Sequence, residues 1–478
     1  MNEVKEYKLK TKHEQLLADT TTAVAIYLRL RDIYPNSILL ESSEYHSRDN
    51  NVSYICCEPL AGIRLDREHL KIQYPGAEKT MTKPADEIHL QQEVSAFRKA
   101  FKADESLGEK LKVTPNGLFG YFTFDCVKHF ENLEITAPPV PEREIPFLQY
   151  HLYRYVIAID HFHNDLHIFE HQVGEDQPSE IEKMRYLIQN KNFPEFDFAT
   201  QGPEQSNMED ADFVALVEKM KTHISRGDVF QIVPSRAFSQ KFSGDEFNVY
   251  RALRSINPSP YLFYFDYGNF RLFGSSPEAQ LTIKNQVASV YPIAGTFRRT
   301  GDLEEDLKKA AELQADPKEN SEHVMLVDLA RNDLSRHCTN VAVKTYKEPQ
   351  YYSHVIHLVS KVSGELKNEE SAFAVVGDSF PAGTLSGAPK HRALQLIDQY
   401  EQYSRSFYSG AIGYMGFQAD FNHAIMIRSF LSQKNTLHYQ AGAGVVADSV
   451  PENELKEVDN KIAALRKALE MAEKMTLS

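Results

Sequence analysis

Near the end of the chain, apolar residues recur at spacings of three and four, which places them along one stripe of a helix. The stripe consists of Leu455, Val458, Ile462, Leu465 and Leu469. Pro451 suits a first helical turn, and Ser449 with Glu452 has the spacing of a capping box. The pattern predicts a helix that begins near residue 451.

Three charged residues share the neighbouring stripe of this helix. Glu454, Glu457 and Lys461 are spaced three and then four apart. A solvated helix face explains them adequately, because a Glu to Lys pair at this spacing contributes only about 0.2–0.5 kcal/mol. A binding site is the alternative, and this stretch alone does not decide between them.

A second helix presents a similar pair of acids. Asp316 and Glu319 have the spacing of a capping box, with Pro317 at the first helical position, and Glu319 and Glu322 then lie on one face. Two helices thus carry Glu-x-x-Glu close to their N-termini. If they converge, four carboxylates require a cation, and oxygen ligands without Cys or His favour Mg²⁺.

Elsewhere the pattern is dominated by strands that come in antiparallel pairs, with helices inserted between groups of strands. The early runs are SILLESS (37–43), NVSYICCEPL (51–60), GLFGYFTFD (117–125) and a hairpin over 153–171 that turns at 163–165. This arrangement predicts an α+β fold. Residues 191–210, rich in Pro, Gly, Ser, Asn and acids, predict an exposed linker between a lobe at 1–190 and a domain at 211–470.

Composition and charge exclude some classes of binding partner. The chain has 478 residues and a net charge of −14, which argues against nucleic acid or an anionic membrane surface. No apolar run reaches the roughly 18 residues of a membrane span, and the N-terminus does not resemble a signal peptide. Cys56, Cys57, Cys126 and Cys338 lack metal-ligand spacing, so we expect reduced thiols in a cytoplasmic protein.

Two motifs that suggest a metal site and a phosphate-binding loop lack the residue spacing that these sites require. His161 and His163 alternate in a predicted strand without a carboxylate or Cys at ligand spacing, so an exposed strand face is the better interpretation. In GTLSGAPK (383–390), Lys390 neither directly follows Gly387 nor precedes Ser or Thr, as a phosphate-binding loop requires.

Several long motifs, in one order from about 210 to 465, resemble the chorismate-binding enzymes. They are GSSPE, PIAGTFRR, SEHVMLVDLARNDL, VGDSFPAGTLSGAPK, SGAIGYMG, MIRSF, QAGAGVVADS and PENELKEVDNK. LLESSE and GLFGYFTFDCVKHFE extend a weaker match to the N-terminal part. The resemblance implies large antiparallel sheets packed as a sandwich with helices outside, a regulatory N-terminal lobe and a chorismate-binding domain.

The resemblance also implies roles for individual residues. Chorismate carries two carboxylates, a hydroxyl at C4 and an enolpyruvyl ether at C3, and loss of the hydroxyl needs a general acid. That acid matches Glu278, and His357 matches a histidine needed for the elimination step. Gln231 and Thr384 match further catalytic positions.

Metal and substrate positions follow in the same way. The Mg²⁺ ligands match Glu322 and Glu457, with Glu319 and Glu454 as outer contacts, and the ion would hold the ring carboxylate. The expected substrate contacts are Gly295, Thr296, Tyr408, Arg428, Lys461 and the backbone N–H groups of Gly442, Ala443 and Gly444.

Two positions discriminate within the family. Relatives that add water have a lysine where this chain has Gln231, and relatives that make aminodeoxychorismate have a nucleophilic lysine where this chain has Ala294. Both residues point to direct addition of ammonia at C2, which gives anthranilate and pyruvate. Aminodeoxychorismate synthase component I and a non-catalytic amino-acid sensor of the same fold are the alternatives.

The resemblance implies partners as well. Because the chain has no glutaminase-type cysteine, we expect a separate glutamine amidotransferase subunit in a heterotetramer. Feedback inhibition by L-tryptophan is expected from two segments. These are Leu40, Glu41 and Ser42 in the first, and Asn257, Pro258, Ser259, Pro260, Tyr261 and Leu262 in the second, where Leu262 replaces a usual Met.

Overall fold

The computed structural model describes residues 5–42, 51–174, 178–351, 355–369 and 371–475. Its helices are α1 (Ala23–Leu30), α2 (Leu90–Lys99), α3 (Ser106–Leu111), α4 (Ile181–Asn190), α5 (Asp210–Ser225), α6 (Phe247–Ile256), α7 (Leu303–Ala315), α8 (Pro317–His337), α9 (Ser371–Ser379), α10 (Lys390–Tyr400) and α11 (Pro451–Met475). Short 3₁₀ helices are η1 (Phe124–His129), η2 (Pro141–Arg143) and η3 (Gly383–Leu385). None of the described helices is both long and apolar enough to cross a membrane.

Strands make up most of the remaining regular structure. The first half of the chain supplies β1 (Tyr7–Leu17), β2 (Ile38–Ser42), β3 (Val52–Leu65), β4 (His69–Gln73), β5 (Met81–Pro84), β6 (Phe101–Lys102), β7 (Gly117–Phe122), β8 (Leu148–Asp160), β9 (Asp165–Val173), β10 (Phe198–Ser206), β11 (Gln231–Ile232) and β12 (Ser235–Gly244). The second half supplies β13 (Tyr261–Asp266), β14 (Phe270–Ser276), β15 (Ala279–Lys284), β16 (Val287–Val290), β17 (Ile293–Arg298), β18 (Cys338–Tyr351), β19 (Val355–Leu366), β20 (Gly387–Ala388), β21 (Ala411–Gly416), β22 (Phe421–Ile425), β23 (Ser429–Gln433) and β24 (Thr436–Gly442).

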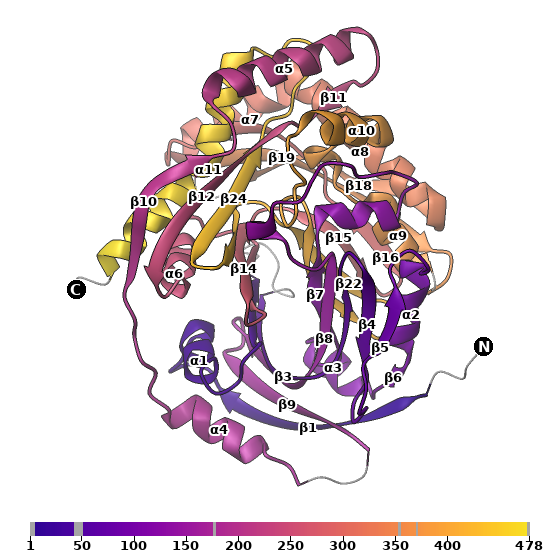
Figure 1. Cartoon of the computed structure of the whole chain (residues 1–478), viewed down its shortest axis with the longest axis vertical. Coiled ribbons are helices and arrows are strands. Elements are labelled where there is room, and N and C mark those ends of the chain that lie inside the picture. The colour runs from indigo at the N-terminus through magenta and orange to yellow at the C-terminus, as the bar shows by residue number, and fades with distance from the viewer. Residues whose placement is uncertain (1–4, 43–50, 175–177, 352–354, 370, 476–478) are drawn as a thin grey trace.

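Almost all of these strands join one continuous, closed network of hydrogen-bonded neighbours, and β11 and β20 form a separate small sheet. Within the described residues the pairs are antiparallel, apart from a short parallel contact between β1 and β6. The helices lie on the outside of the strands (Figure 1). The predicted α+β sandwich of antiparallel sheets is therefore confirmed.

The sheet network encloses one apolar core and carries a second on its outer faces. The inner core gathers side chains from strands of both halves, such as Phe119 on β7, Phe263 on β13 and Ile412 on β21. The outer core includes Ile462 and Leu465 of α11, the predicted apolar stripe, both almost fully buried. A sheet face and a helix stripe that are apolar must each bury themselves against another layer, which produces this arrangement.

Strands from the predicted lobe and the predicted domain pair directly. β2 lies between β3 and β13, and β7 pairs with both β8 and β21. The boundary at 191–210 stays a prediction, but part of that segment is not a linker. Residues 198–206 form β10, which hydrogen-bonds to β12 although most of its side chains are exposed.

Local signals placed several element ends correctly. α11 begins at Pro451, and Asp316 Oδ1 accepts the backbone N–H of Glu319 at 3.0 Å in the first turn of α8. The predicted cap at Ser449 is wrong, because its Oγ accepts the N–H of Val446 at 3.1 Å. Pro451 occupies the first helical position, so the helix begins one residue too late for Ser449 to cap it.

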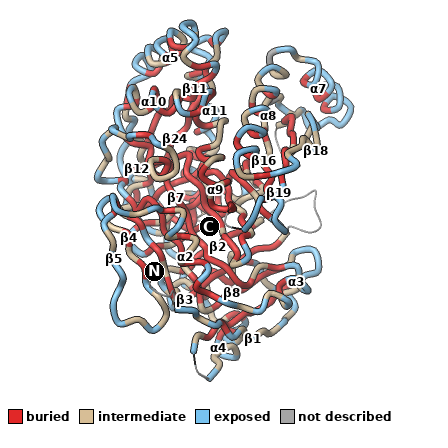
Figure 2. Tube along the Cα trace, turned by 90° about the vertical axis from the view of Figure 1, so that its right-hand side faces the viewer, coloured by how far each residue is buried: buried red, intermediate tan, exposed pale blue. Residues whose placement is uncertain are grey.

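Two groups of helices stand apart at one end of the molecule. Figure 2 shows α7 and α8 with β18 on one arm, and α5, α10 and α11 on the other. The two Glu-x-x-Glu pairs therefore belong to different arms, and the sheets below connect them.

Candidate active site

Glu278 lies in the connection from β14 to β15 and is buried, with a relative exposure of 9%. Burial raises the pKa of its carboxyl to about 7, against the opposing effects of a hydrogen bond from Thr384 and the charges of Lys461 and Arg428. Thr384 Oγ1 donates to Glu278 Oε1 at 2.8 Å. The sequence signal for Glu278 thus leads to a buried carboxyl whose protonated form is substantially populated near neutral pH.

His357 on β19 faces a bulge in β17. The register between these strands shifts between Ala294 and Thr296, which leaves Gly295 as the extra residue, with φ of +79°. His357 Nδ1 donates to the carbonyl of Gly295 at 3.0 Å, because a carbonyl can only accept. Burial lowers the pKa of His357 to about 4, so its Nε2 is a neutral basic nitrogen at pH 7.

Arg428 lies between β22 and β23 in a left-handed conformation, with φ of 49°. Its carbonyl accepts the N–H of Ser275 at 3.1 Å, and its guanidinium donates to Asn257 Oδ1 at 3.5 Å. The charge of Arg428 lowers the pKa of both Glu278 and His357. Arg428 therefore joins the acid and the histidine in one charged environment.

The segment after β24 comes close to two predicted side chains. A Cβ on Gly442 would lie 3.1 Å from Tyr408 Oη, and a Cβ on Gly444 would lie 2.8 Å from Gln231 Nε2. Glycine at both positions lets the backbone approach these groups. Burial raises the pKa of Tyr408 to about 12, so the phenol stays neutral.

One predicted donor of this segment has another role. The N–H of Ala443 donates to the carbonyl of Pro234 at 3.2 Å, so it has a protein partner here, and its contact with substrate stays a prediction. The backbone of Gly442 forms a hydrogen bond with Tyr408. Gly444 remains the candidate backbone donor.

Lys461 connects α11 to the same segment. Its Nζ donates to the carbonyl of Gly442 at 2.8 Å and lies 2.7 Å from Glu457 Oε1. Because Lys461 also acts on the pKa of Glu278, the predicted favourable pair on the helix surface is in addition part of the site.

The acids of the two helices offer oxygen donors only. Glu319 approaches the bulge, since a Cβ on Gly295 would lie 3.2 Å from Glu319 Oε2. Glu322 is half-buried on α8, Glu454 is buried on α11, and Glu457 is 47% exposed. No group of three or more His, Cys, Asp or Glu among the described residues is arranged to hold a metal. A donor set of carboxylates fits Mg²⁺, which takes one or two of them together with water and substrate oxygens.

Most predicted catalytic and substrate residues therefore come together through direct contacts or shared electrostatics. The exceptions are Ala443, whose N–H is already used, and Thr296, of which the structure describes the backbone only. All four cysteines are buried free thiols. Lys390 pairs with Asp333 at 2.9 Å, which agrees with the rejection of a phosphate-binding loop.

The two predicted tryptophan segments are neighbours in the sheet. β2 pairs with β13, so that Leu262 lies opposite Glu41 and Tyr261 opposite Ser42. Glu41 is buried and accepts from Arg254 Nε at 2.9 Å. Asn257, at the end of α6, contacts Arg428 of the candidate active site. The structure thus brings together segments that are more than 200 residues apart in sequence.

Arg405 holds several site segments together and was not found from the sequence. It is 1% exposed and pairs with Glu401 at 2.6 Å. It also donates to the carbonyl of Leu385, beside Thr384, at 2.8 Å, and to that of Val233 at 2.6 Å. Glu401 is only four residues away, but Leu385 and Val233 are distant in sequence, so no local pattern indicates that Arg405 joins these segments.

Comparison with known proteins agrees with this geometry. Residues 63–467 match the chorismate binding enzyme family. Anthranilate synthase component 1 from Aquifex aeolicus is 36% identical over 98% of this chain and 96% of its own length, and that from Neisseria gonorrhoeae is 36% identical over 96% and 95%. The crystal structure of anthranilate synthase component I from Streptococcus pneumoniae has a TM-score of 0.74 at 28% identity, covering 95% of this chain and 99% of its own.

The fold extends to more distant enzymes. The menaquinone-specific isochorismate synthase from Escherichia coli has a TM-score of 0.74 at 19% identity, covering 97% of this chain and 95% of its own. That likeness concerns the fold alone. On the family match and the full-length relatives, the chain belongs to the chorismate binding enzyme family, among the anthranilate synthase component 1 proteins.

Proposed function

We propose that this chain converts chorismate and ammonia into anthranilate and pyruvate. The observation that carries the proposal is Glu278, a buried carboxyl whose pKa is raised to about 7 by burial. Hydroxide is a poor leaving group, so loss of the C4 hydroxyl needs a side chain that is protonated near neutral pH. A carboxyl with its ordinary pKa would be ionised there.

The substrate is a dianion, and the site offers cations for it. Arg428 and Lys461 both act on the pKa of Glu278, so they lie close to the reacting region. The enolpyruvyl carboxylate would be bound by Arg428 with Tyr408 and the N–H of Gly444. The ring carboxylate would lie toward Lys461 and the carboxylates of the two arms.

Glu322 and Glu457 would hold Mg²⁺, with Glu319 and Glu454 as outer contacts. Bound Mg²⁺ would supply positive charge that neutralises the ring carboxylate and withdraws electron density from the ring. In the first step Glu278 gives its proton to the C4 hydroxyl as ammonia adds at C2. In the second step His357 Nε2 accepts a ring proton as pyruvate leaves and the ring becomes aromatic.

Two residues favour amination at C2 over the reactions of related enzymes, which add water or form aminodeoxychorismate. Gln231 lies against Gly444 and carries an amide, which cannot act as the base that activates water. Ala294 in β17 carries no nucleophile for an aminodeoxychorismate pathway. Ammonia needs no deprotonation before it attacks, so neither residue is an obstacle to direct amination.

The partner and the regulation belong to the same proposal. A glutamine amidotransferase subunit would supply ammonia, in a cytoplasmic heterotetramer, and L-tryptophan would bind where β2 meets β13. The support for tryptophan binding is the pairing of the two segments and the contact from Asn257 to Arg428.

Product analysis tests the proposal. Purified chain is incubated with chorismate, Mg²⁺ and ammonium, and products are separated and identified by mass. We expect anthranilate and pyruvate in equal amounts, and no anthranilate when glutamine alone replaces ammonium. Isochorismate or aminodeoxychorismate as the main product would overturn the proposal.

A further inference from the structure

Residues 379–389, called the Thr384 loop below, connect α9 to α10, and one side chain joins the two ends of this loop. Lys390, the first residue of α10, donates from Nζ to the carbonyl of Asp378, in the last turn of α9, at 2.6 Å. Asp378 and Lys390 flank the loop on either side. The ammonium of Lys390 therefore closes the loop across its base.

The same ammonium attaches the loop to α8. Lys390 Nζ also donates to Asp333 Oδ2 at 2.9 Å, and both side chains are buried, with exposures of 9% for Lys390 and 12% for Asp333. Asp378 is held by α8 as well, because His337 Nδ1 lies 2.6 Å from Asp378 Oδ2. The two acceptors of Lys390 are thus both fixed to one helix.

The centre of the Thr384 loop packs directly on α8. A Cβ on Gly383 would lie 2.2 Å from Leu329 Cδ2, so the lack of a side chain at Gly383 lets the loop approach this helix closely. The next residue, Thr384, donates from Oγ1 to Glu278 Oε1 at 2.8 Å. The loop therefore connects α8 to the proposed acid through one hydroxyl.

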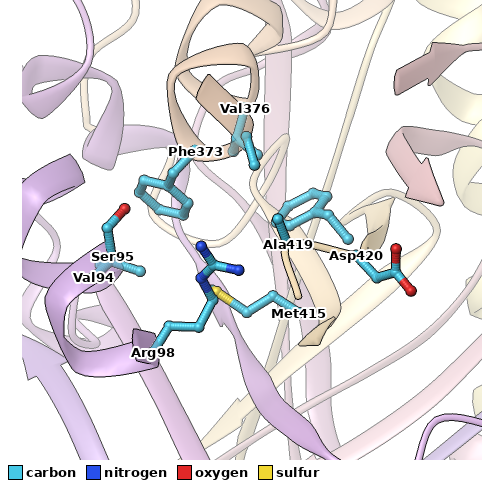
Figure 3. A pocket seen from close by; sticks show the side chains of 10 residues that line it. Val94, Ser95, Arg98, Phe373, Val376, Met415, Ala419 and Asp420 are labelled. Carbon is cyan, nitrogen blue, oxygen red and sulfur yellow. The ribbon is translucent and has the colours of Figure 1, made fainter. Parts of the chain in front are cut away.

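α9 gives the loop a well-packed base. It packs along α8, and on its other side Phe373 and Val376 surround a small cavity with Arg98 of α2 and Met415 of β21 (Figure 3). That cavity has a volume of only about 20 Å³, and Arg98 donates to the carbonyl of Phe417 at 2.8 Å. Loss of the Lys390 bonds would therefore release the loop rather than move α9.

We propose that Lys390 is a positioning residue, which holds the Thr384 loop through Asp333 and the carbonyl of Asp378 so that Thr384 donates to Glu278. Lys390 acts on the reaction only through Thr384. Its effect on activity rests on the proposed function, in which Glu278 is the general acid. Its effect on the conformation of the loop does not.

A buried ion pair is not needed merely to stabilise this packing. Apolar side chains of similar volume often stabilise a protein as well or better, because a buried charge loses its hydration. An ammonium has three N–H donors and can bind two fixed acceptors at once. Lys390 therefore supplies a direction to the loop that an apolar contact could not supply.

The hydrogen bond from Thr384 acts on the ionisation of Glu278. It opposes the burial that raises the pKa of this carboxyl, as do the charges of Lys461 and Arg428. A released loop would withdraw the hydroxyl, so the pKa of Glu278 would rise further and the carboxyl would lose one of its orienting contacts. Lys461 and Arg428 lie on other elements and would remain in place.

Three variants separate positioning from folding. Lys390→Met removes the ammonium and retains the length of the side chain. Asp333→Leu/Lys390→Met removes both charges together, so that neither is left buried and unpaired, and stability should return toward wild type. Thr384→Val removes the hydroxyl but retains the branched shape, and it serves as the reference for loss of the hydrogen bond to Glu278.

Arg154→Met is the matched control. Arg154 on β8 pairs with the buried Glu170 of β9 at 2.9 Å. β9 and α4 lie at the opposite end of the molecule from α8 and α10 (Figure 1). This variant also removes the cation of a buried ion pair, so it should lower the melting temperature and keep kcat/KM for chorismate within twofold of wild type.

The first measurement compares crystal structures of the wild type, Lys390→Met and Asp333→Leu/Lys390→Met. In both variants we expect the distance from Thr384 Oγ1 to Glu278 Oε1 to exceed about 3.5 Å, beyond a hydrogen bond, while α9 keeps its position. An intact hydrogen bond in a variant that lacks the ammonium would overturn the proposal, whatever the chain catalyses.

The second measurement is the pH profile of kcat/KM for chorismate at a fixed concentration of free ammonia. At pH 7, Lys390→Met, Asp333→Leu/Lys390→Met and Thr384→Val should each lose at least about tenfold, since a displacement of about 1 Å at an active site can cost about 10²-fold. In all three, kcat/KM should begin to fall at a higher pH than in wild type, because the hydrogen bond that lowers the pKa of Glu278 is gone. Arg154→Met should keep the wild-type profile.

A double-mutant comparison tests whether Lys390 acts through Thr384. Lys390→Met/Thr384→Val should be no slower than Thr384→Val, within about twofold, because residues that act through one interaction are not additive. Losses that multiply would overturn the proposal. So would recovery of activity together with stability in Asp333→Leu/Lys390→Met, since Lys390 would then have a structural role only. If Lys390→Met does not fold, Asp333→Leu/Lys390→Met takes its place in this comparison.

These experiments keep the two proposals apart. A wild-type chain that makes no anthranilate would overturn the proposed function. The crystal structures would still decide whether Lys390 holds the Thr384 loop against Glu278.

Discussion

At the scale of single residues, burial sets the protonation state that each proposed role needs. It raises the pKa of Glu278 to about 7 and lowers the pKa of His357 to about 4. Desolvation disfavours the charged form of either group, so the acid keeps its proton and the imidazole stays neutral. One physical cause therefore prepares an acid and a base in the same site.

The first prediction concerns pH. In the proposed mechanism Glu278 acts in its protonated form, so kcat/KM for chorismate should be constant well below pH 7 and fall about tenfold per unit above it, as a single ionisation requires. The measurement is a pH profile at a fixed concentration of free ammonia, since the ammonia fraction itself rises with pH. A profile that stays flat to pH 9 would exclude Glu278 as the acid.

The second prediction concerns the elimination step. His357→Ala should lower anthranilate formation by roughly 10²–10⁴-fold and let an aminated, non-aromatic intermediate accumulate. Rapid quench and mass analysis measure both species. His438→Ala is the matched control, because His438 is also buried with a pKa lowered to about 4 but lies on β24. Equal loss of both species in His357→Ala would contradict the assigned step.

At the scale of elements, the sequence predicted what local chemistry determines. Pro451 begins α11, Asp316 caps α8, and the hairpin of β8 and β9 turns where expected. Motif resemblance pointed to Glu278 and to the two segments that we propose bind tryptophan. Periodicity could not reveal that β2 pairs with β13, because that contact depends on the whole sheet.

The features that the sequence did not predict also depend on contacts between distant segments. β10 lies in a segment whose composition is typical of a linker, and its strand conformation comes from pairing with β12. Arg405 acts through carbonyls of remote segments. Long-range contacts of this kind leave no periodic signal in the sequence.

The third prediction concerns the β2–β13 pair. Glu41→Gln removes the charged partner of Arg254 and should weaken tryptophan binding at least about tenfold, since charge-assisted hydrogen bonds are worth about 1.5–3 kcal/mol. The chain contains no tryptophan, so the fluorescence of the added ligand reports binding directly. Glu93→Gln, which breaks an ion pair with Lys83 elsewhere, is the control. Unchanged tryptophan affinity in Glu41→Gln would contradict the proposed site.

At the scale of the whole molecule, the proposed metal ligands belong to two separate arms. α8 carries Glu319 and Glu322, and α11 carries Glu454 and Glu457 (Figure 2). A cation between the arms would reduce the repulsion of these carboxylates and attract the dianionic substrate. Binding of metal and substrate is therefore expected to be coupled to the separation of the arms.

The fourth prediction concerns the proposed ion between the two arms. Glu322→Gln and Glu457→Gln should each raise the Mg²⁺ concentration for half-maximal activity at least about tenfold, as loss of one charged oxygen ligand requires. Glu452→Gln, in the first turn of α11, should leave it unchanged. If only one of the two variants, Glu322→Gln or Glu457→Gln, raised the Mg²⁺ requirement, the two arms would not share one ion.

A comparison of wild type with Glu278→Gln tests whether this carboxyl is the general acid. Chorismate binding is measured by calorimetry, and anthranilate formation by fluorescence with Mg²⁺ and ammonium present. We expect Glu278→Gln to bind chorismate within about threefold of wild type and to lose at least about 10²-fold in anthranilate formation. Anthranilate formation at the wild-type rate in Glu278→Gln would contradict it.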